Sequence, residues 1–271
     1  MADGAATKRI TLREIARMKR DSEKLVVVTA YDVLFARIVD ASGVDIVLVG
    51  DSVGNVVAGF DSTLPVTLDQ MIYHGAAVRR GVKRAFLVVD MPFLSYQASV
   101  ERAILNCGRV LQETGADAVK VEGGYPEMIS TVAALTRTGI PVMAHIGFTP
   151  QSVHTLGMRI QGREDGDAER LVAEAKALEQ AGAFSIVLEL LPADVAGKIT
   201  AAVTIPTIGI GAGPRCDGQV LVLPDLLGLN DGFAPKFLKR YASVADVARG
   251  AVASYAAEVR SGKYPDAEHS N

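Results

Sequence analysis

Apolar β-branched runs recur along the chain at intervals that match a repeated strand-and-helix unit. The runs are short and rich in Val, Ile and Leu, and stretches with the period of an amphipathic helix separate most of them. Their spacing is roughly 30 residues, the size of one βα unit. The predicted strands span residues 25–30, 46–50, 86–90, 118–122, 142–146, 185–190, 207–210 and 220–223.

Helix signals fill most of the intervals between these strands. Thr11-Leu12-Arg13-Glu14 has the pattern of a capping box, which opens a short helix that ends near Arg20. The segment from Gly147 to Gly166 is long for a βα connection, and long ordered loops are often functional. The other predicted helices span residues 33–40, 67–80, 95–113, 126–138, 167–181, 193–202 and 244–261.

This alternation predicts an α/β protein built as a (β/α)8 TIM barrel with a short N-terminal helix. Near-continuous apolar strands are typical of a parallel sheet that is buried on both faces. Eight units in about 250 residues match this barrel. An open, doubly wound sheet is the competing architecture, but no GxGxxG motif follows the first strand. We expect a single domain over residues 1–271, with loose tails at residues 1–9 and 263–271.

The composition restricts the cellular compartment in which we expect the protein and the classes of partner that it could bind. The chain has 271 residues, of which 49% are hydrophobic, and its net charge of −3 gives no basic excess for nucleic acid or an anionic membrane. No apolar run approaches the roughly 18 residues of a membrane span. Cys107 and Cys216 form no CxxC pair, which suits a reducing compartment and gives no zinc site. We expect a cytoplasmic protein that binds neither nucleic acid nor membranes.

Acidic residues stand at the ends of four predicted strands. They are Asp51, Asp90, Glu122 and Glu189. Because the carboxyl ends of the strands meet at one mouth of a (β/α)8 barrel, we expect these four side chains in one cavity. Lys120 lies two residues before Glu122 and therefore on the same face of its strand.

A cluster of this kind needs positive charge. Several carboxylates in one pocket repel one another unless they share a cation, and Lys120 supplies only one. The candidate ligands are all oxygen, which favours Mg²⁺. A metal beside a spare carboxylate suits chemistry next to a carbonyl, because the metal stabilises the enolate of an α-keto acid while a base removes the neighbouring proton.

Each of these residues also has a structural alternative. Asp51 and Asp90 could cap turns, and Lys120 could simply pair with the acid two residues further on. His145, near the end of the fifth predicted strand, could be a core histidine. Glu189 is the hardest to explain in this way, because an acid inside a buried strand is seldom tolerated without a partner.

The sequence resembles the ketopantoate hydroxymethyltransferase (3-methyl-2-oxobutanoate hydroxymethyltransferase) family from about Thr11 to Pro265. The most specific motifs are Gly50-Asp51-Ser52 and Lys120-Val121-Glu122-Gly123-Gly124. Other matching segments are 29–32, 49–54, 63–67, 73–74, 90–93, 145–152, 209–213, 217–219 and 235–237.

The resemblance implies a (β/α)8 barrel that transfers a hydroxymethyl group from 5,10-methylenetetrahydrofolate to 3-methyl-2-oxobutanoate. The implied product is 2-dehydropantoate, on the route to pantothenate and coenzyme A. The resemblance also implies a Mg²⁺ site and a homo-oligomer, typically a decamer.

Carried over position by position, the family's site falls on the residues singled out above and on Ser52. The implied roles are metal binding for Asp51, Asp90 and Glu122, substrate binding for Asp51, Ser52, Asp90, Lys120 and His145, and proton removal from C3 for Glu189. One departure from many relatives is a loop, Leu156-Gly157-Met158-Arg159, that is one residue shorter. We expect this loop to close over the substrate or the folate.

Two other functions remain open on the residues alone. One is a Mg²⁺-dependent lyase or mutase of the phosphoenolpyruvate mutase and isocitrate lyase type, which shares the barrel, the metal and the enolate. It would usually need a reactive cysteine or a phosphate-facing arginine near the mouth. The other is a non-catalytic barrel, against which the presence of all four acids and Lys120 argues.

Overall fold

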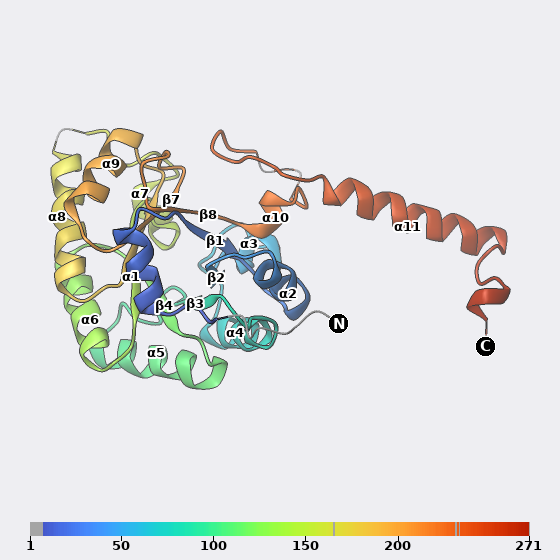
Figure 1. The fold of residues 1–271 in the computed structure, drawn as a ribbon, viewed down its shortest axis with the longest axis horizontal. Coiled ribbons are helices and arrows are strands. Elements are labelled where there is room, and N and C mark those ends of the chain that lie inside the picture. The colour runs from blue at the N-terminus through green and yellow to red at the C-terminus, as the bar shows by residue number, and fades with distance from the viewer. Residues whose placement is uncertain (1–7, 165, 231, 233, 271) are drawn as a thin grey trace. The chain divides into compact units, whose positions relative to one another are not determined.

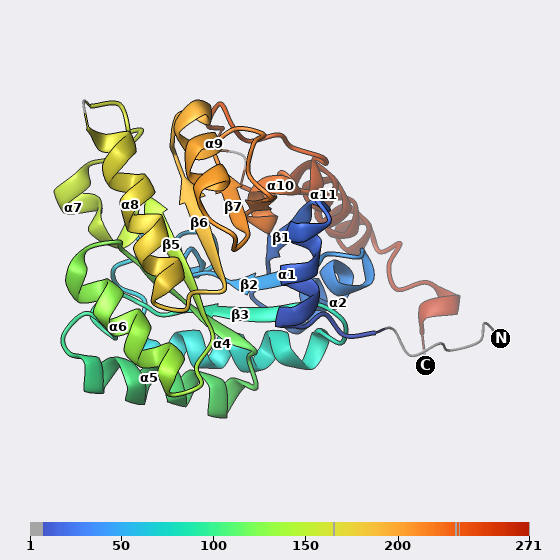
Figure 2. The same cartoon turned by 60° about the vertical axis from the view of Figure 1, so that its left-hand side comes forward.

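The structure is a computed structural model that describes residues 8–164, 166–230, 232 and 234–270. It contains two compact units, Met1–Val222 and Leu223–Asn271. In the first unit the parallel strands β1 to β8 pair in sequence order, and β8 pairs with β1 to close a barrel (Figures 1 and 2). The predicted (β/α)8 barrel is therefore confirmed.

The strands and helices alternate through most of the first unit. The strands are β1 (Leu25–Thr29), β2 (Ile46–Val49), β3 (Phe86–Asp90), β4 (Ala118–Glu122), β5 (Val142–Gly147), β6 (Ser185–Glu189), β7 (Thr207–Ile210) and β8 (Gly218–Leu221). The helices are α1 (Leu12–Arg20), α2 (Val33–Ala41), α3 (Val53–Val56), α4 (Leu68–Gly81), α5 (Val100–Thr114), α6 (Pro126–Arg137), α7 (Val153–Leu156), α8 (Asp167–Gln180), α9 (Ala193–Ala202), α10 (Leu223–Leu226) and α11 (Val244–Ser261), with 3₁₀ turns η1 (Pro150–Ser152) and η2 (Ala267–His269). Helices α4, α5, α6 and α8 lie around the outside of the barrel (Figure 2).

The barrel interior changes character along each strand. Side chains alternate between the two faces of a strand, so every second one points inward. On β3 the inward series runs from Phe86 through Val88 to Asp90, and on β5 from Met143 to His145. Strands β4 and β6 repeat this order. The barrel interior is therefore apolar toward the amino-terminal ends of the strands, and ionisable groups fill it at their carboxyl ends.

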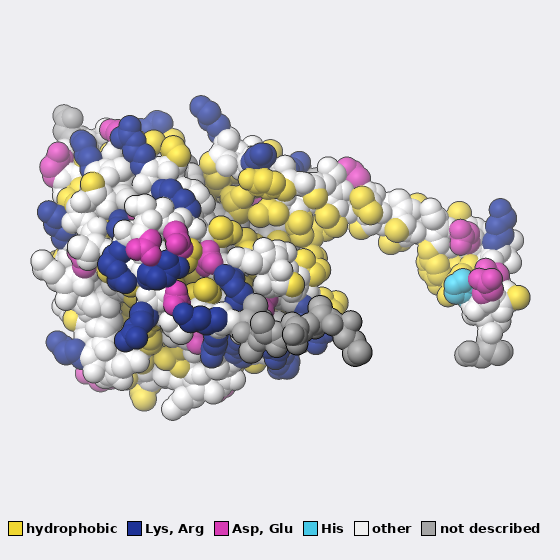
Figure 3. Space-filling model, viewed as in Figure 1, with side chains coloured by type: hydrophobic (Ala, Val, Ile, Leu, Met, Phe, Trp, Pro, Cys, Tyr) yellow, Lys and Arg dark blue, Asp and Glu magenta, His cyan; other side chains and the backbone are white. Residues whose placement is uncertain are grey.

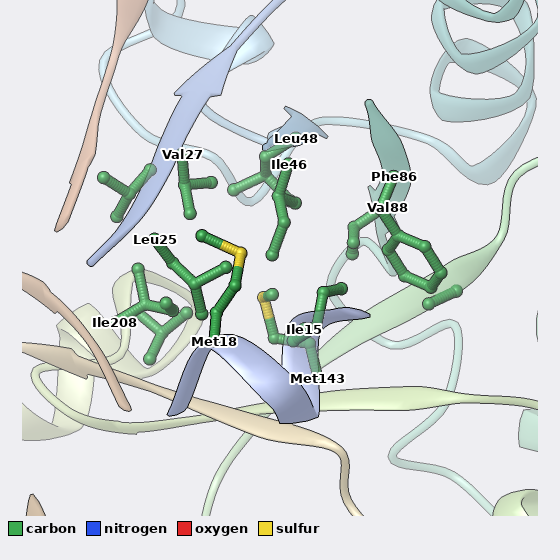
Figure 4. Packing of buried hydrophobic residues seen from close by; sticks show 13 residues of the cluster. Ile15, Met18, Leu25, Val27, Ile46, Leu48, Phe86, Val88, Met143 and Ile208 are labelled. Carbon is green, nitrogen blue, oxygen red and sulfur yellow. The ribbon is translucent and has the colours of Figure 1, made fainter. Parts of the chain in front are cut away.

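Helix α1 closes the amino-terminal end of the barrel. The Thr11 hydroxyl accepts a hydrogen bond from the Glu14 backbone N–H, as the capping-box pattern predicts. Ile15 and Met18 are buried and pack against the inward side chains of the strands (Figure 4). The barrel residues of this cluster are Leu25, Val27, Ile46, Leu48, Phe86, Val88, Ala118, Met143, Val187, Ile208 and Val220.

Two predicted elements are displaced in the structure. The helix predicted from residue 95 begins at Val100, because Ser99 has extended backbone and its side chain caps the Arg102 N–H. Residues 91–98 form an irregular connection that contains Leu94 at φ +61°. The last strand starts at Gly218, two residues earlier than predicted, because residues 218–221 pair with β1 although Gly218 and Gln219 are not apolar.

The second unit contains α10, α11 and η2. Helix α11 has its predicted bounds, and none of its residues is buried. Its apolar side chains gather along the helix (Figure 3), and the large exposed ones are Val247, Val252, Tyr255 and Val259. No helix in the described ranges is long and apolar enough to cross a membrane. Residues 1–7 and 271 of the predicted loose tails lie outside the described residues. The predicted tail at residues 263–271 contains the 3₁₀ turn η2.

Candidate active site

The barrel brings the sequence-predicted residues together at one end. Asp90, Glu122 and Glu189 are the last residues of β3, β4 and β6, and Asp51 follows β2. Asp51, Asp90 and Glu122 are 3–5% exposed, whereas the Glu189 side chain keeps 17% exposure. Lys120 lies two residues before Glu122 on β4 and is also buried. All four acids therefore meet at the carboxyl end of the barrel, three of them buried and Glu189 partly exposed.

Contacts between neighbouring strands join these groups into a chain. The register of β3 and β4 sets Asp90 opposite Lys120, and Asp90 Oδ1 lies 3.3 Å from Lys120 Nζ. Asp90 Oδ2 accepts a hydrogen bond of 3.0 Å from the Asp51 backbone N–H. Lys120 Nζ lies 3.2 Å from His145 Nδ1, and His145 Nε2 lies 3.2 Å from Glu189 Oε2. Lys120 thus pairs across strands rather than with the acid on its own strand.

The geometry determines which nitrogen of His145 carries the proton. An ammonium group can only donate, so Nδ1 accepts from Lys120. Burial, together with the charge on Lys120, lowers the pKa of His145 well below its usual value. The ring is therefore neutral, with its proton on Nε2, the nitrogen that faces Glu189.

Burial shifts the titration of every acid in the pocket. It raises the pKa of Asp90 and of Glu189 to about 7, and it raises the pKa of Asp51 and Glu122 as well. Burial also disfavours the charged form of Lys120, but the surrounding carboxylates outweigh it and raise its pKa. Lys120 therefore stays charged, and the acids outnumber the positive charge available to them.

Two carboxylate oxygens show this deficit directly. Asp90 Oδ1 and Glu122 Oε1 are buried and accept no hydrogen bond from the described residues. A buried acceptor without a donor costs free energy, and a cation would satisfy both oxygens. In the described part of the chain, no group of three or more Asp, Glu, His or Cys side chains is arranged to hold a metal ion by itself. The two oxygens that accept no hydrogen bond are hard donors, which suit a cation that takes one or two carboxylates and completes its shell with water, as Mg²⁺ does.

Ser52 lies beside the acids at the start of α3. Its hydroxyl is 2.8 Å from the Tyr31 hydroxyl. Gly50 is required next to it, because a Cβ at that position would lie 2.6 Å from Ser52 Oγ and 3.6 Å from Asp90 Oδ2. The missing side chain therefore allows the β2–α3 turn to bring Ser52 and the Asp51 N–H close to Asp90.

Sequence reasoning missed two residues that touch the acids. Gln151, in η1, bonds to Asp51 and Glu122, and the Tyr96 hydroxyl accepts a hydrogen bond from the Glu122 N–H. Gln151 lies inside the segment 145–152 that carries the family resemblance, so a signal for it was present. Tyr96 fell within the helix predicted from residue 95, where a buried tyrosine is unremarkable packing.

Comparison with known proteins gives consistent matches. The model of the family described as Ketopantoate hydroxymethyltransferase matches residues 9–267. A protein from Pelobacter propionicus named 3-methyl-2-oxobutanoate hydroxymethyltransferase is 56% identical over 264 residues, which cover 97% of each chain. A protein of the same name from Moorella thermoacetica is 53% identical over 267 residues, 98% of this chain and 99% of the relative.

Solved structures show the same fold. The crystal structure of 2,3-dimethylmalate lyase, described as a PEP mutase/isocitrate lyase superfamily member, superposes with a TM-score of 0.60. The match covers 96% of this chain and 91% of the lyase at 15% identity. Such a low identity supports the barrel fold alone.

Proposed function

Because the chain belongs to the ketopantoate hydroxymethyltransferase family, we propose that the acid cluster at the barrel mouth is its active site. The protein is an enzyme, a hydroxymethyltransferase of pantothenate biosynthesis. The acceptor is 3-methyl-2-oxobutanoate, the donor 5,10-methylenetetrahydrofolate and the product 2-dehydropantoate. The observation that supports this site most strongly is that three buried acids and the partly exposed Glu189 meet around Lys120, with two buried carboxylate oxygens that accept no hydrogen bond from the described residues.

Glu189 is the proposed base that removes the proton from C3 of the keto acid. Its pKa of about 7 leaves about half of it ionised and able to accept a proton at neutral pH, and it is more exposed than the other acids. His145 Nε2 lies 3.2 Å from its carboxylate but forms no hydrogen bond with the described residues, so His145 is next to Glu189 without fixing its orientation. The resulting enolate carbon then forms a C–C bond with the methylene carbon of the folate. The C–N bonds of that carbon break, their electron pairs leave with tetrahydrofolate, and water supplies the hydroxyl group of the product.

Lys120 and Ser52 are proposed to hold the other end of the substrate. Lys120 is the positive charge that the buried pocket offers to a carboxylate or a keto oxygen, and its raised pKa keeps it charged. The Ser52 hydroxyl is oriented by its contact of 2.8 Å with the Tyr31 hydroxyl. Together they fix the keto acid so that C3 faces Glu189.

The proposed metal is Mg²⁺, held by Asp51 and Asp90, with Glu122 as the third acid of the site. Asp90 Oδ1 and Glu122 Oε1, which accept no hydrogen bond from the described residues, support this assignment. When bound, Mg²⁺ would stabilise the negative charge that develops on the keto oxygen during proton removal. Asp90 and Asp51 are already joined by a backbone hydrogen bond, so the protein orients them without the metal.

We further propose a cytoplasmic homo-oligomer, expected to be a decamer. The apolar side chains along α11 are typical of a surface that another copy of the chain covers. Native mass spectrometry of the intact protein and of a variant ending at Ser243 tests this. A monomeric intact protein, or an unchanged assembly after truncation, would contradict the role of α11.

The lyase or mutase alternative receives no support from the cysteines. Cys107 and Cys216 are free and buried, and burial raises the pKa of both thiols, that of Cys107 to about 12. Neither thiol is therefore a reactive thiolate near neutral pH.

The proposed function is tested by incubating purified protein with 3-methyl-2-oxobutanoate, 5,10-methylenetetrahydrofolate and Mg²⁺. We expect 2-dehydropantoate by mass spectrometry, and its loss when a chelator is added. In D₂O without folate, proton NMR should show exchange at C3, because enolisation precedes attack. A strict need for folate would contradict this order of steps, and an absence of product in the complete mixture would refute the function.

A further inference from the structure

Gln151 connects two of the site acids that are not neighbours in the barrel. It lies on the loop after β5 and is 6% exposed. Its side-chain Nε2 donates to Asp51 Oδ2 at 2.9 Å, and its backbone N–H donates to Glu122 Oε2 at 3.0 Å. One residue therefore holds one oxygen of an acid that follows β2 and one oxygen of an acid that ends β4.

The orientation of the Gln151 amide is determined by its partners. Nε2 also donates to the Met91 carbonyl at 2.9 Å, and a carbonyl can only accept. Oε1 accepts from the Tyr96 hydroxyl at 2.8 Å and from Gln97 Nε2 at 2.9 Å. The amide cannot rotate by half a turn without losing these bonds, so its donor stays directed at Asp51.

Tyr96 closes the network. Its side chain is fully buried, and its hydroxyl donates to Gln151 while accepting from the Glu122 backbone N–H at 3.0 Å. Tyr96, Gln151 and Glu122 therefore form a closed ring of hydrogen bonds. In this ring Glu122 Oε2 is engaged, and Oε1 is the oxygen that remains without a donor.

We propose that Tyr96 and Gln151 are positioning residues that hold Asp51 and Glu122 in the orientation in which they receive a cation. This proposal rests on the proposed function, since it assigns the clamp to that same site. Hydrogen-bonding partners of this kind, one step behind the ligands, typically change metal affinity 10- to 100-fold when they are lost. The substrate does not need to touch either residue.

The test uses full-length, metal-free protein and measures Mn²⁺ binding by electron paramagnetic resonance. Gln151→Met removes both amide functions at similar volume, and we expect the Mn²⁺ affinity to fall about 10- to 100-fold. Tyr96→Phe removes only the hydroxyl and should lower the affinity by a smaller factor. The double variant should bind no more weakly than Gln151→Met, because both residues act through one network.

Gln97→Met is the matched control. Gln97 also donates to Gln151 Oε1, but no hydrogen bond joins it to Asp51 or Glu122 in the described residues. Its Mn²⁺ affinity should stay within about twofold of the wild type, since the Tyr96 bond still orients the amide. An equal loss in this control would show a general packing effect and overturn the clamp.

A crystal structure of metal-free Gln151→Met separates this proposal from the proposed function. Rotation of the Asp51 carboxylate, with the backbone in place, is the expected result, whereas Glu122 keeps the Gln151 backbone N–H, which methionine retains. An unmoved Asp51 carboxylate or wild-type Mn²⁺ affinity would overturn the clamp, even if the enzyme is active. Wild-type protein that yields no 2-dehydropantoate would refute the proposed function, whatever the carboxylate does. If Gln151→Met does not fold, Tyr96→Phe takes its place in the binding measurement, where a loss of affinity larger than that of Gln97→Met supports the clamp and an equal affinity overturns it.

Discussion

Strand β2 has an acid near each end, Asp45 directly before its first residue and Asp51 two residues after its last. Asp45 accepts a hydrogen bond from the Val26 N–H at 3.0 Å and lies 3.3 Å from Arg84 Nη2. Asp51 lies among other acids, and burial raises its pKa. Asp45 is therefore held by a backbone donor and a positive charge, whereas Asp51, six residues further along the chain, lies among negative charges.

Strand β4 shows the same contrast. Asp117, before the strand, accepts from the Leu87 N–H at 2.9 Å and pairs with Arg9 at 2.6 Å. Glu122, at its other end, leaves one oxygen without a hydrogen bond from the described residues.

Parallel strands begin with free N–H groups and end with free carbonyls, so the strands themselves offer backbone donors at the amino-terminal rim. At the carboxyl rim the backbone donors come from the loops, such as the N–H groups of Asp51 and Gln151. Acids at the amino-terminal rim stabilise the barrel, whereas acids at the carboxyl rim need a cation or a ligand.

The largest expected effect comes from Glu189, at the carboxyl rim. Glu189→Gln removes the proposed base and should slow C3 deuterium exchange by about a thousandfold, within the range for loss of a general base. Substrate binding in the presence of Mg²⁺ should remain, as measured by calorimetry. Exchange at the wild-type rate would exclude Glu189 as the base.

A matched pair on β2 tests the contrast itself. Asp51→Asn should weaken Mg²⁺ binding at least about tenfold by calorimetry. The melting temperature should not fall, because a buried charge is removed. Asp45→Asn should keep the Mg²⁺ affinity and lower the melting temperature. If both variants changed the same property, the two rims would not differ in the way described.

The pH dependence sharpens the assignment of Glu189. Its pKa of about 7 predicts that C3 exchange rises about tenfold per pH unit below pH 6 and levels off above 7. Between its ordinary value of 4.5 and 7 the folded protein holds a proton that the unfolded chain has released, so this group's contribution to stability declines as pH rises. Thermal melts across this range should show that decline, and it should be smaller in Glu189→Gln, where Asp90, whose pKa is also about 7, still contributes to it.

The smallest effect on activity is expected at the base of the barrel. Asp217 accepts from the Thr207 N–H at 2.9 Å and pairs with Lys19 at 2.7 Å. Asp217→Ala leaves both donors without this partner and should lower the free energy of unfolding by about 2–4 kcal/mol in urea denaturation. The kcat/KM should stay within twofold, and a large loss of activity would show that the two ends are coupled.

The sequence was sufficient for those features that depend on local order. Apolar runs predicted the strands because a barrel buries both faces, and Asp90 and Glu122 were noticed because an acid is costly there. The barrel topology then implied that they meet. These inferences need only the position of a residue along its own strand.

Contacts between distant segments were not predictable in the same way. The partner of Lys120 depends on the register of β3 against β4, and the sequence equally allowed the acid on its own strand. Tyr96 was assigned to a helix because the Ser99 cap is a weak local signal. Gln151 reaches Asp51 across 100 positions of the chain, and no local pattern encodes that approach.

The position of helix α1 limits where the chain can be truncated or circularly permuted. Ile15 and Met18 cover inward side chains such as Leu25, Phe86 and Met143. A protease that removed α1 would open the floor of the barrel and expose a ring of apolar groups, a surface that promotes aggregation. Circular permutants and affinity tags should therefore leave the segment from Thr11 to β1 continuous.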